Sequence, residues 1–169
     1  MKNLFLFVFL LAITTTSAQE IEWLTWEQAI EKSATDEQPK KIFVDVYTDW
    51  CGWCKKMDKD TFNNPEVAAY MKANFYMVKM DAEGKEDIEY MGKTFKYVGQ
   101  GKRGYHELAA ALLQGKMSFP TVIFLNENVE IISPVPGYQK PDSFLKVAKY
   151  FGEEIYKTQD WATYEAQKS

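Results

Sequence analysis

Eight residues at positions 49–56, Asp-Trp-Cys-Gly-Trp-Cys-Lys-Lys, constrain this chain more than any other stretch. They hold both cysteines of the protein, Cys51 and Cys54, which are separated by two residues. The run 42–47 before them is apolar and rich in β-branched residues, which predicts a buried central strand. The residues after them predict a helix. The cysteine pair is therefore expected where a strand passes into the N-terminus of a helix.

Two thiols at such a junction can form a redox couple. A thiol has a pKa of about 8.5 in water, and the unpaired N–H groups and positive dipole end of a helix can lower it to roughly 7. We therefore expect Cys51, at the start of the helix, to be the attacking sulfur. Cys54 lies one turn deeper and can attack a mixed disulfide on Cys51, which releases the substrate thiol. Cys54 is the expected resolving cysteine.

Length and charge limit the classes of function. The 169 residues, of which 46% are hydrophobic, suit one domain with one sizeable core. The formal net charge is −4 at pH 7, so nothing favours binding to nucleic acid or to an anionic membrane surface.

The N-terminus has the composition of a secretory signal peptide. Lys2 is followed by an apolar run at 4–13 and then by small and polar residues up to Ala18, after which the cut is expected. A short membrane anchor is the alternative, but the run is shorter than the roughly 20 residues that span a bilayer. We therefore expect residues 1–18 to be removed and a periplasmic or secreted protein to remain. In an oxidising compartment a lone close cysteine pair forms either a structural or a redox-active disulfide. A disulfide that closes so short a loop stabilises the fold little, because it constrains little of the unfolded chain.

Hydrophobic periodicity and turn residues predict the other elements. Helices are expected at 25–33, at 55–73 with an interruption before Pro65, at 105–114, at 141–151 and in a C-terminal extension; strands are expected at 75–81, 121–125 and 129–133. Ile88, Met91 and Phe95 lie at helical spacing, which predicts an extra helix within 83–98. The glycine-rich residues 99–104 are expected to form a flexible loop, and residues 134–137 a bend.

A carboxylate, Asp45, lies inside the predicted central strand, six residues before Cys51. Burial disfavours the charged form of an acid, so the pKa of Asp45 is expected above its solution value. Such a group can accept the proton of Cys54 and produce the thiolate that resolution needs. The alternative is a buried acid paired to a lysine for structural reasons. Lys79 could reach it if the strand at 75–81 is a neighbour.

The dipeptide Phe119-Pro120 opens the strand predicted at 121–125. A cis bond would turn the Phe119 backbone outward as a hydrogen-bonding edge for an incoming peptide, whereas a trans proline at a sheet edge is the alternative.

His106 is the only histidine, and no histidine follows Cys54 directly. We therefore expect no metal site, no covalently attached haem and no other cofactor.

From about residue 41 to residue 151 the chain resembles thioredoxin-fold proteins, most closely the exported bacterial thioredoxin-like proteins. Three landmarks match in order: Asp45 before the cysteines, Trp-Cys-Gly-Trp-Cys-Lys at 50–55, and Phe-Pro-Thr at 119–121. The resemblance implies an α/β thioredoxin fold with a central mixed sheet of four to five strands and helices on both faces. Residues 19–169 would form a single such domain, with an N-terminal helix and a C-terminal helical extension.

The resemblance also implies roles for particular residues. Cys51 would be the nucleophile and Cys54 the resolving thiol, and the bond before Pro120 would be cis. Substrate contact is implied for Trp50, Gly52, Trp53, Phe119 and Pro120. The chain departs from the family at Trp53, where proline is common. The dipeptide between the cysteines, Gly52-Trp53 here, tunes the reduction potential. Counting back from Asp81 places Met77 where thioredoxins often carry the lysine partner of the buried aspartate.

The leading hypothesis is an exported thiol-disulfide oxidoreductase that reduces disulfides of protein or peptide substrates. The resemblance implies a DsbD-type membrane electron donor as its partner. A thiol oxidase or isomerase is one alternative, because the residues between the cysteines do not decide the direction of exchange. Another is a binding module in which both thiolates hold a soft ion such as Cu(I).

Overall fold

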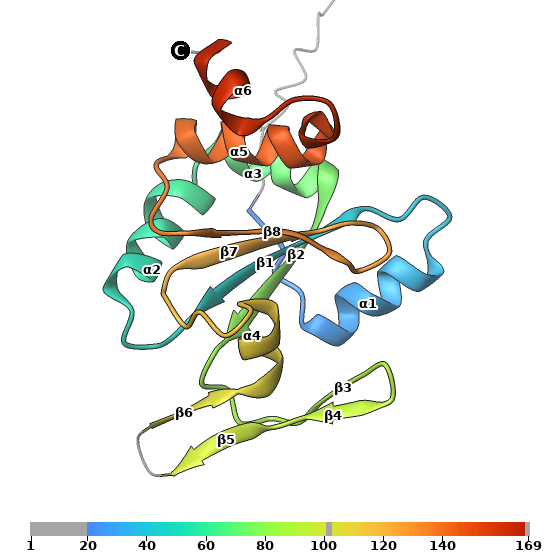
Figure 1. Ribbon diagram of the computed structural model, residues 1–169, viewed down its shortest axis with the longest axis vertical. Coiled ribbons are helices and arrows are strands. Elements are labelled where there is room, and N and C mark those ends of the chain that lie inside the picture. Colours follow the sequence, from blue (N-terminus) through green and yellow to red (C-terminus); the bar gives the residue numbers. More distant parts are fainter. Residues whose placement is uncertain (1–19, 101–102, 168–169) are drawn as a thin grey trace, which may run out of the picture.

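A four-stranded mixed sheet forms the centre of the molecule (Figure 1). The computed structural model describes residues 20–100 and 103–167. The sheet order is β2-β1-β7-β8, from strands β1 (Lys41–Tyr47), β2 (Phe75–Asp81), β7 (Thr121–Leu125) and β8 (Ile131–Pro136). β1 runs parallel to β2 and antiparallel to β7, and β7 is antiparallel to β8. The strands predicted at 42–47, 75–81 and 121–125 are confirmed.

Helices cover both faces of this sheet (Figure 1). One face packs against α2 (Gly52–Met57), the π-helical segment η1 (Asp58–Phe62), α3 (Pro65–Asn74) and α5 (Pro141–Gly152). The other face packs against α1 (Trp26–Thr35) and α4 (Glu107–Leu112). Phe43 of β1 belongs to the first core and Val44 to the second, as the two-residue period of a strand requires. The predicted α/β architecture is confirmed.

Side chains at the helix starts satisfy free backbone donors. Thr25 caps α1, because its Oγ1 accepts the N–H of Gln28 at 3.3 Å while the Gln28 Oε1 accepts the N–H of Thr25 at 2.8 Å. Asn64 caps α3, which begins with Pro65. The predicted interruption is confirmed at Asn63 and Asn64, which separate α3 from the π-helical segment η1.

The extra helix predicted within 83–98 is wrong. This stretch forms a hairpin of β3 (Ile88–Tyr90) and β4 (Lys93–Phe95). Met91 and Gly92 join the two strands with φ angles of 51° and 72°. Two successive residues with positive φ are the signature of a type I′ hairpin turn, whose twist matches that of the flanking strands. The turn therefore overrides the helical spacing of the apolar residues.

The flexible loop predicted at 99–104 is also wrong for the part that the structure describes. β5 (Tyr97–Gln100) and β6 (Arg103–His106) form a second antiparallel hairpin, whose connecting residues 101–102 lie outside the described residues. The ring of Tyr97 lies across Gly104, where a Cβ atom would overlap the ring and come within 2.7 Å of the Val98 carbonyl oxygen. Gly104 therefore allows the aromatic packing that holds the hairpin.

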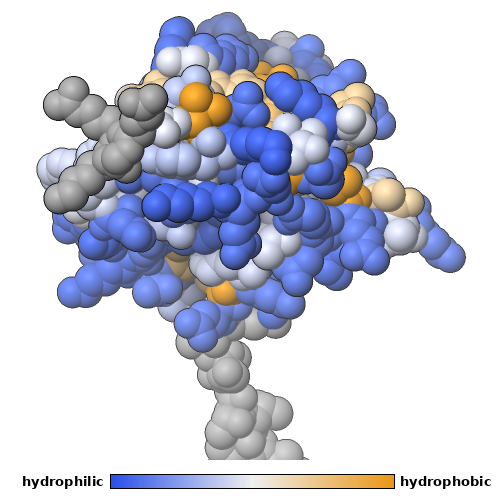
Figure 2. Space-filling model, turned by 90° about the horizontal axis from the view of Figure 1, so that it is seen from below, coloured by the Kyte–Doolittle hydropathy of each residue, from blue (hydrophilic) through white to orange (hydrophobic). Residues whose placement is uncertain are grey.

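Both hairpins lie at one end of the molecule, below α4 in Figure 1. Figure 2 views the molecule from that side and shows a mostly hydrophilic surface with scattered hydrophobic residues. The single histidine, His106, is buried and caps α4, because its Nδ1 accepts the N–H of Leu108 at 3.2 Å. The helix predicted at 105–114 is thus confirmed in a shorter form, and it ends before Gly115, whose φ is 78°.

The last strand differs from its prediction. The bend expected at 134–137 is wrong, because β8 continues to Pro136, with Pro134 paired to Ile123 and Pro136 to Thr121. β8 is an edge strand, where proline is tolerated since its missing N–H need not join the ladder.

Beyond α5, the C-terminal extension forms a 3₁₀ turn η2 (Ile155–Lys157) and the helix α6 (Trp161–Gln167). The predicted signal peptide, residues 1–18, lies outside the described residues.

Candidate active site

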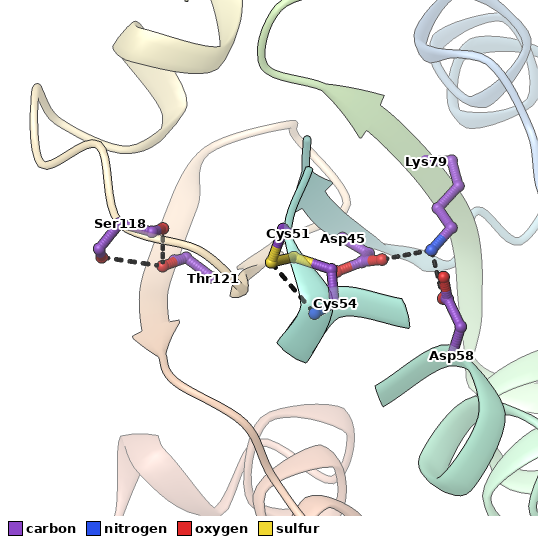
Figure 3. The surroundings of a disulfide bond; sticks show 7 residues. All are labelled: Asp45, Cys51, Cys54, Asp58, Lys79, Ser118 and Thr121. Carbon is purple, nitrogen blue, oxygen red and sulfur yellow. Dashed lines mark hydrogen bonds and ion pairs between the residues drawn. A yellow bond between two sulfur atoms is a disulfide. The ribbon is translucent and has the colours of Figure 1, made fainter. Parts of the chain in front are cut away.

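The two cysteines lie where β1 leads into α2, as predicted. Cys51 caps the helix and forms a disulfide with Cys54 (Figure 3). The backbone N–H of Cys54 donates to the Cys51 Sγ at 3.1 Å. The same N–H can donate to a Cys51 thiolate in the reduced protein, and a hydrogen bond to the charged form lowers the pKa of a thiol. Both cysteines are buried in the disulfide form, Cys51 at 4% and Cys54 at 2% exposure.

Asp45 lies behind the disulfide, in the middle of β1 and 1% exposed. Its partner across the parallel strands is Lys79 of β2, whose Nζ donates to the Asp45 Oδ2 at 2.6 Å. Figure 3 shows the same ammonium between Asp45 and Asp58, with which it also forms an ion pair. Met77 instead lies opposite Phe43. The lysine partner that the sequence comparison with thioredoxins placed at Met77 is therefore Lys79.

The charges around Asp45 only partly offset the effect of burial on its pKa. Burial raises the pKa of Asp45 from 3.8 to about 6, although the Lys79 ammonium lowers it and the Asp58 carboxylate raises it. The Asp45 Oδ1 is buried and has no hydrogen-bond partner. In Figure 3 the Asp45 carboxyl group extends from β1 between Lys79 and the Cys51–Cys54 pair. A carboxylate that titrates near neutrality, with one free oxygen, suits a proton acceptor.

The Phe119–Pro120 peptide bond is cis, as the resemblance implied. The Pro120 carbonyl accepts the N–H of Gly137 at 2.8 Å, which ties this segment to the end of β8. The Thr121 Oγ1 donates to the Ser118 carbonyl at 2.8 Å. Figure 3 shows Ser118 and Thr121 on the segment that faces the disulfide. The cis bond therefore lies within a hydrogen-bonded turn opposite the two cysteines.

Two exposed indoles flank the disulfide. Trp50 is 66% exposed, and its ring meets that of Phe119 edge-on with centroids 5.8 Å apart. Trp53 is 59% exposed and lies 5.4 Å from the ring of Tyr138. Between them, a Cβ atom at Gly52 would meet no atom within 4 Å, so the space above the helix start is open. Of the predicted contact residues, Trp50, Gly52 and Trp53 are exposed, Phe119 is half-buried against Trp50, and Pro120 is buried.

Other residues of the site were not predicted. The Trp50 Nε1 donates to the Glu83 Oε1 at 3.0 Å, and the Tyr138 hydroxyl donates to the Asp60 Oδ2 at 3.2 Å. These contacts join segments far apart in the chain, so local patterns do not reveal them. Asp58 is different, because it follows Cys54 by four residues. The i,i+4 spacing could have placed it on the same helix face.

A mixed sheet with helices on both faces, a cysteine pair at a helix start and a cis-proline opposite it define a thioredoxin-fold protein. The family model Thioredox_DsbH, described as "Protein of unknown function, DUF255", matches residues 12–143. The chain belongs to this family.

Curated relatives match only parts of their own length. "Thiol:disulfide interchange protein DsbD" of Haemophilus ducreyi is 28% identical over 134 residues, which are 78% of this chain and 20% of the relative. "Disulfide bond reductase DsbH" of Chlamydia pneumoniae is 28% identical over 103 residues, 59% of this chain and 61% of the relative. Human "Spermatogenesis-associated protein 20" is 30% identical over 76 residues, 44% of this chain and 9% of the relative.

Solved structures share the fold. "DsbH Oxidoreductase" superposes with a TM-score of 0.58 at 19% identity and covers 86% of this chain and 94% of its own. A thioredoxin-fold protein from Helicobacter pylori superposes with a TM-score of 0.57 at 20% identity over 76% of this chain and 79% of its own. Within residues 20–100 and 103–167, every helix is too short or too polar to cross a membrane.

Proposed function

We propose that this protein is an exported thiol-disulfide oxidoreductase that reduces disulfides in protein or peptide substrates. The observation that carries the proposal is the Cys51–Cys54 disulfide at the start of α2, with the free Oδ1 of the buried Asp45 behind it. The relatives named as thiol:disulfide interchange protein and disulfide bond reductase support the same class of reaction.

In the first step, the reduced Cys51 attacks a substrate disulfide as a thiolate. The hydrogen bond from the Cys54 N–H, which the disulfide form already makes to the Cys51 Sγ, favours this thiolate. A bond forms between the Cys51 sulfur and one substrate sulfur, and the substrate disulfide breaks. The second substrate sulfur leaves as a thiolate and takes a proton from solvent.

In the second step, Cys54 resolves the mixed disulfide. Asp45 accepts the proton of the Cys54 thiol, and the resulting thiolate attacks the Cys51 sulfur. The Cys51–Cys54 bond forms, the bond from Cys51 to the substrate breaks, and the released substrate thiolate takes up a proton. The substrate gains two electrons and the cysteine pair loses two, which leaves the disulfide state that the structure holds.

The face around the disulfide suits an extended peptide. The backbone of Phe119 is the proposed hydrogen-bonding edge for the substrate, and the exposed Trp50 and Trp53 offer apolar surface. Gly52 leaves room for a substrate backbone to approach the sulfurs.

Turnover needs a dithiol donor that reduces the pair again. Its proposed source is a membrane electron donor of the DsbD type, in a periplasmic or secreted setting, with residues 1–18 as the signal peptide and 19–169 as the working domain. In the alternatives, an oxidase would run this exchange in reverse, and an isomerase would rearrange substrate disulfides through Cys51 without net electron transfer.

Trapping tests the proposal. The reduced Cys54→Ser variant, incubated with a peptide disulfide, should accumulate a mixed disulfide on Cys51 that dithiothreitol releases. The Cys51→Ser variant, the matched control, should accumulate far less. The wild-type chain should reduce insulin with dithiothreitol as donor. Equal trapping by both variants, or stoichiometric Cu(I) retention without turnover, would contradict the proposal.

A further inference from the structure

The ammonium of Lys79 lies close to three aromatic rings. Its Nζ is 4.7 Å from the ring centroid of Trp23, 5.1 Å from that of Tyr47 and 5.6 Å from that of Phe62. The same Nζ pairs with a carboxylate of β1 and one of η1, Asp45 and Asp58. Aromatic faces attract cations, most strongly the face of tryptophan. Trp23 is the ring nearest to this ammonium among the three.

Trp23 belongs to a segment before α1, residues 21–24, which we call the N-terminal strap. The Leu24 N–H donates to the Met77 carbonyl at 2.7 Å, and the Lys79 N–H donates to the Leu24 carbonyl at 3.3 Å. Both backbone groups of Leu24 thus bond the strap to the outer edge of β2, on either side of Val78. The Trp23 ring also meets that of Phe62 edge-on, with centroids 5.3 Å apart. Its position over Lys79 is therefore held from two directions.

We propose that Trp23 is a positioning residue for the resolving step: its indole keeps the Lys79 ammonium on Asp45 while Asp45 accepts the proton of Cys54. The inference rests on the proposed function, since it concerns the proton acceptor of that reaction. The geometry that points to it is one ammonium shared by two carboxylates and covered by the strap.

The two carboxylates compete unequally for the ammonium. The side chain of Asp45 is 2% exposed and that of Asp58 is 41% exposed, while Lys79 lies between at 23%. Without the indole, water reaches Lys79, and the ammonium moves toward the exposed Asp58 and solvent. Asp45 then loses part of the positive charge that favours its ionised form. The charged and titratable groups that face Asp45 are Lys79 from β2, Asp58 from η1 and Cys54 from α2, with Tyr47 on its own strand.

The test replaces the ring by an apolar chain that still fills space. Trp23→Met should raise the midpoint at which the Asp45 carboxyl carbon titrates, followed by carbon-13 NMR in the oxidised protein, by roughly half a pH unit. Trp23→Phe keeps an aromatic face and should restore most of the wild-type midpoint. Trp161→Met, which removes a half-buried indole packed on Tyr150 far along the chain, is the matched control and should leave the midpoint unchanged.

The reaction provides a second readout. Below pH 6, resolution of a mixed disulfide by Cys54 should slow about threefold in Trp23→Met, the fold-change that half a pH unit implies. Attack by Cys51, measured in a Cys54→Ser background, should keep its wild-type rate. An unmoved or lowered Asp45 midpoint, or an equal shift in Trp161→Met, would overturn the inference. Because the NMR titration needs no turnover, it separates this outcome from a wild-type protein that fails to reduce disulfides at all.

Discussion

Lys79 and Asp45 face each other across two parallel strands, and the Lys79 Nζ lies 2.6 Å from the Asp45 Oδ2. Burial alone would lower the pKa of Lys79, but Asp45 and Asp58 outweigh it and raise that pKa. The lysine therefore stays charged, whereas burial brings the pKa of Asp45 to about 6. Near neutral pH the acid can exchange a proton while its partner does not.

This difference predicts how stability depends on pH. Asp45 titrates near pH 3.8 when unfolded and about 6 when folded, so the folded state binds the proton more tightly. Its contribution to stability is full below pH 3.8 and is lost as the pH rises through 6, by about 3 kcal/mol. Asp45→Asn should abolish this loss and be more stable than the wild type at pH 7.5. Urea unfolding at pH 4 and pH 7.5 measures the free energy of unfolding of both proteins. The same change between the two pH values in Asp45→Asn and in the wild type would contradict the prediction.

The same substitution should separate the two chemical steps. Resolution by Cys54 should accelerate in the wild type as the pH rises through about 6, because Asp45 must be ionised to accept the proton. Asp45→Asn should lose this rise and slow resolution about a hundredfold, the low end of general-base catalysis. Attack by Cys51 should change much less. Stopped-flow decay of a preformed mixed disulfide is the measurement, and an unchanged pH profile would exclude Asp45 as the acceptor.

Tyr138 should affect substrate binding more than chemistry. Its ring lies 5.4 Å from that of Trp53, and its hydroxyl bonds to Asp60. Tyr138→Ala frees the Trp53 indole and should raise KM for a peptide disulfide about two- to twelvefold, since such ring pairs contribute roughly 0.5–1.5 kcal/mol. Tyr138→Phe keeps the ring and should stay close to the wild type. A fall in kcat at constant KM would show that the ring acts in the chemistry instead.

Gly104 should be needed for the second hairpin. In Gly104→Ala the new methyl group would overlap the Tyr97 ring and lie 2.7 Å from the Val98 carbonyl oxygen. Overpacking of this kind typically lowers the free energy of unfolding by about 1–3 kcal/mol. Gly52→Ala, whose Cβ meets no atom within 4 Å, is the control and should not destabilise the protein. Equal melting temperatures for the two variants would refute the prediction.

The sheet and the cysteine pair could be predicted because their signals are local. The β-branched run at 42–47, the helix after Cys54 and the cap at Asn64 each depend on a few adjacent residues. The contact of Lys79 with Asp45 needed only the two-residue period and one assumption about neighbouring strands, and β2 does lie beside β1.

The rest depends on long-range packing. The apolar spacing of Ile88, Met91 and Phe95 fits a helix, but the positive φ angles at Met91 and Gly92 decide for a hairpin. The Tyr97 ring over Gly104, seven residues away, likewise turns a glycine-rich stretch into paired strands. Local pattern cannot supply such contacts, since each is fixed only when two strands meet.

The two prolines of β8 limit what the sheet can join. Neither Pro134 nor Pro136 can donate to β7, so in a regular ladder both nitrogens face away from the sheet. A foreign strand laid along this border would meet carbonyl oxygens but no amide hydrogens at those alternate positions. At this border, therefore, neither a stray chain nor a second copy of the protein can continue the sheet by regular pairing at Pro134 and Pro136.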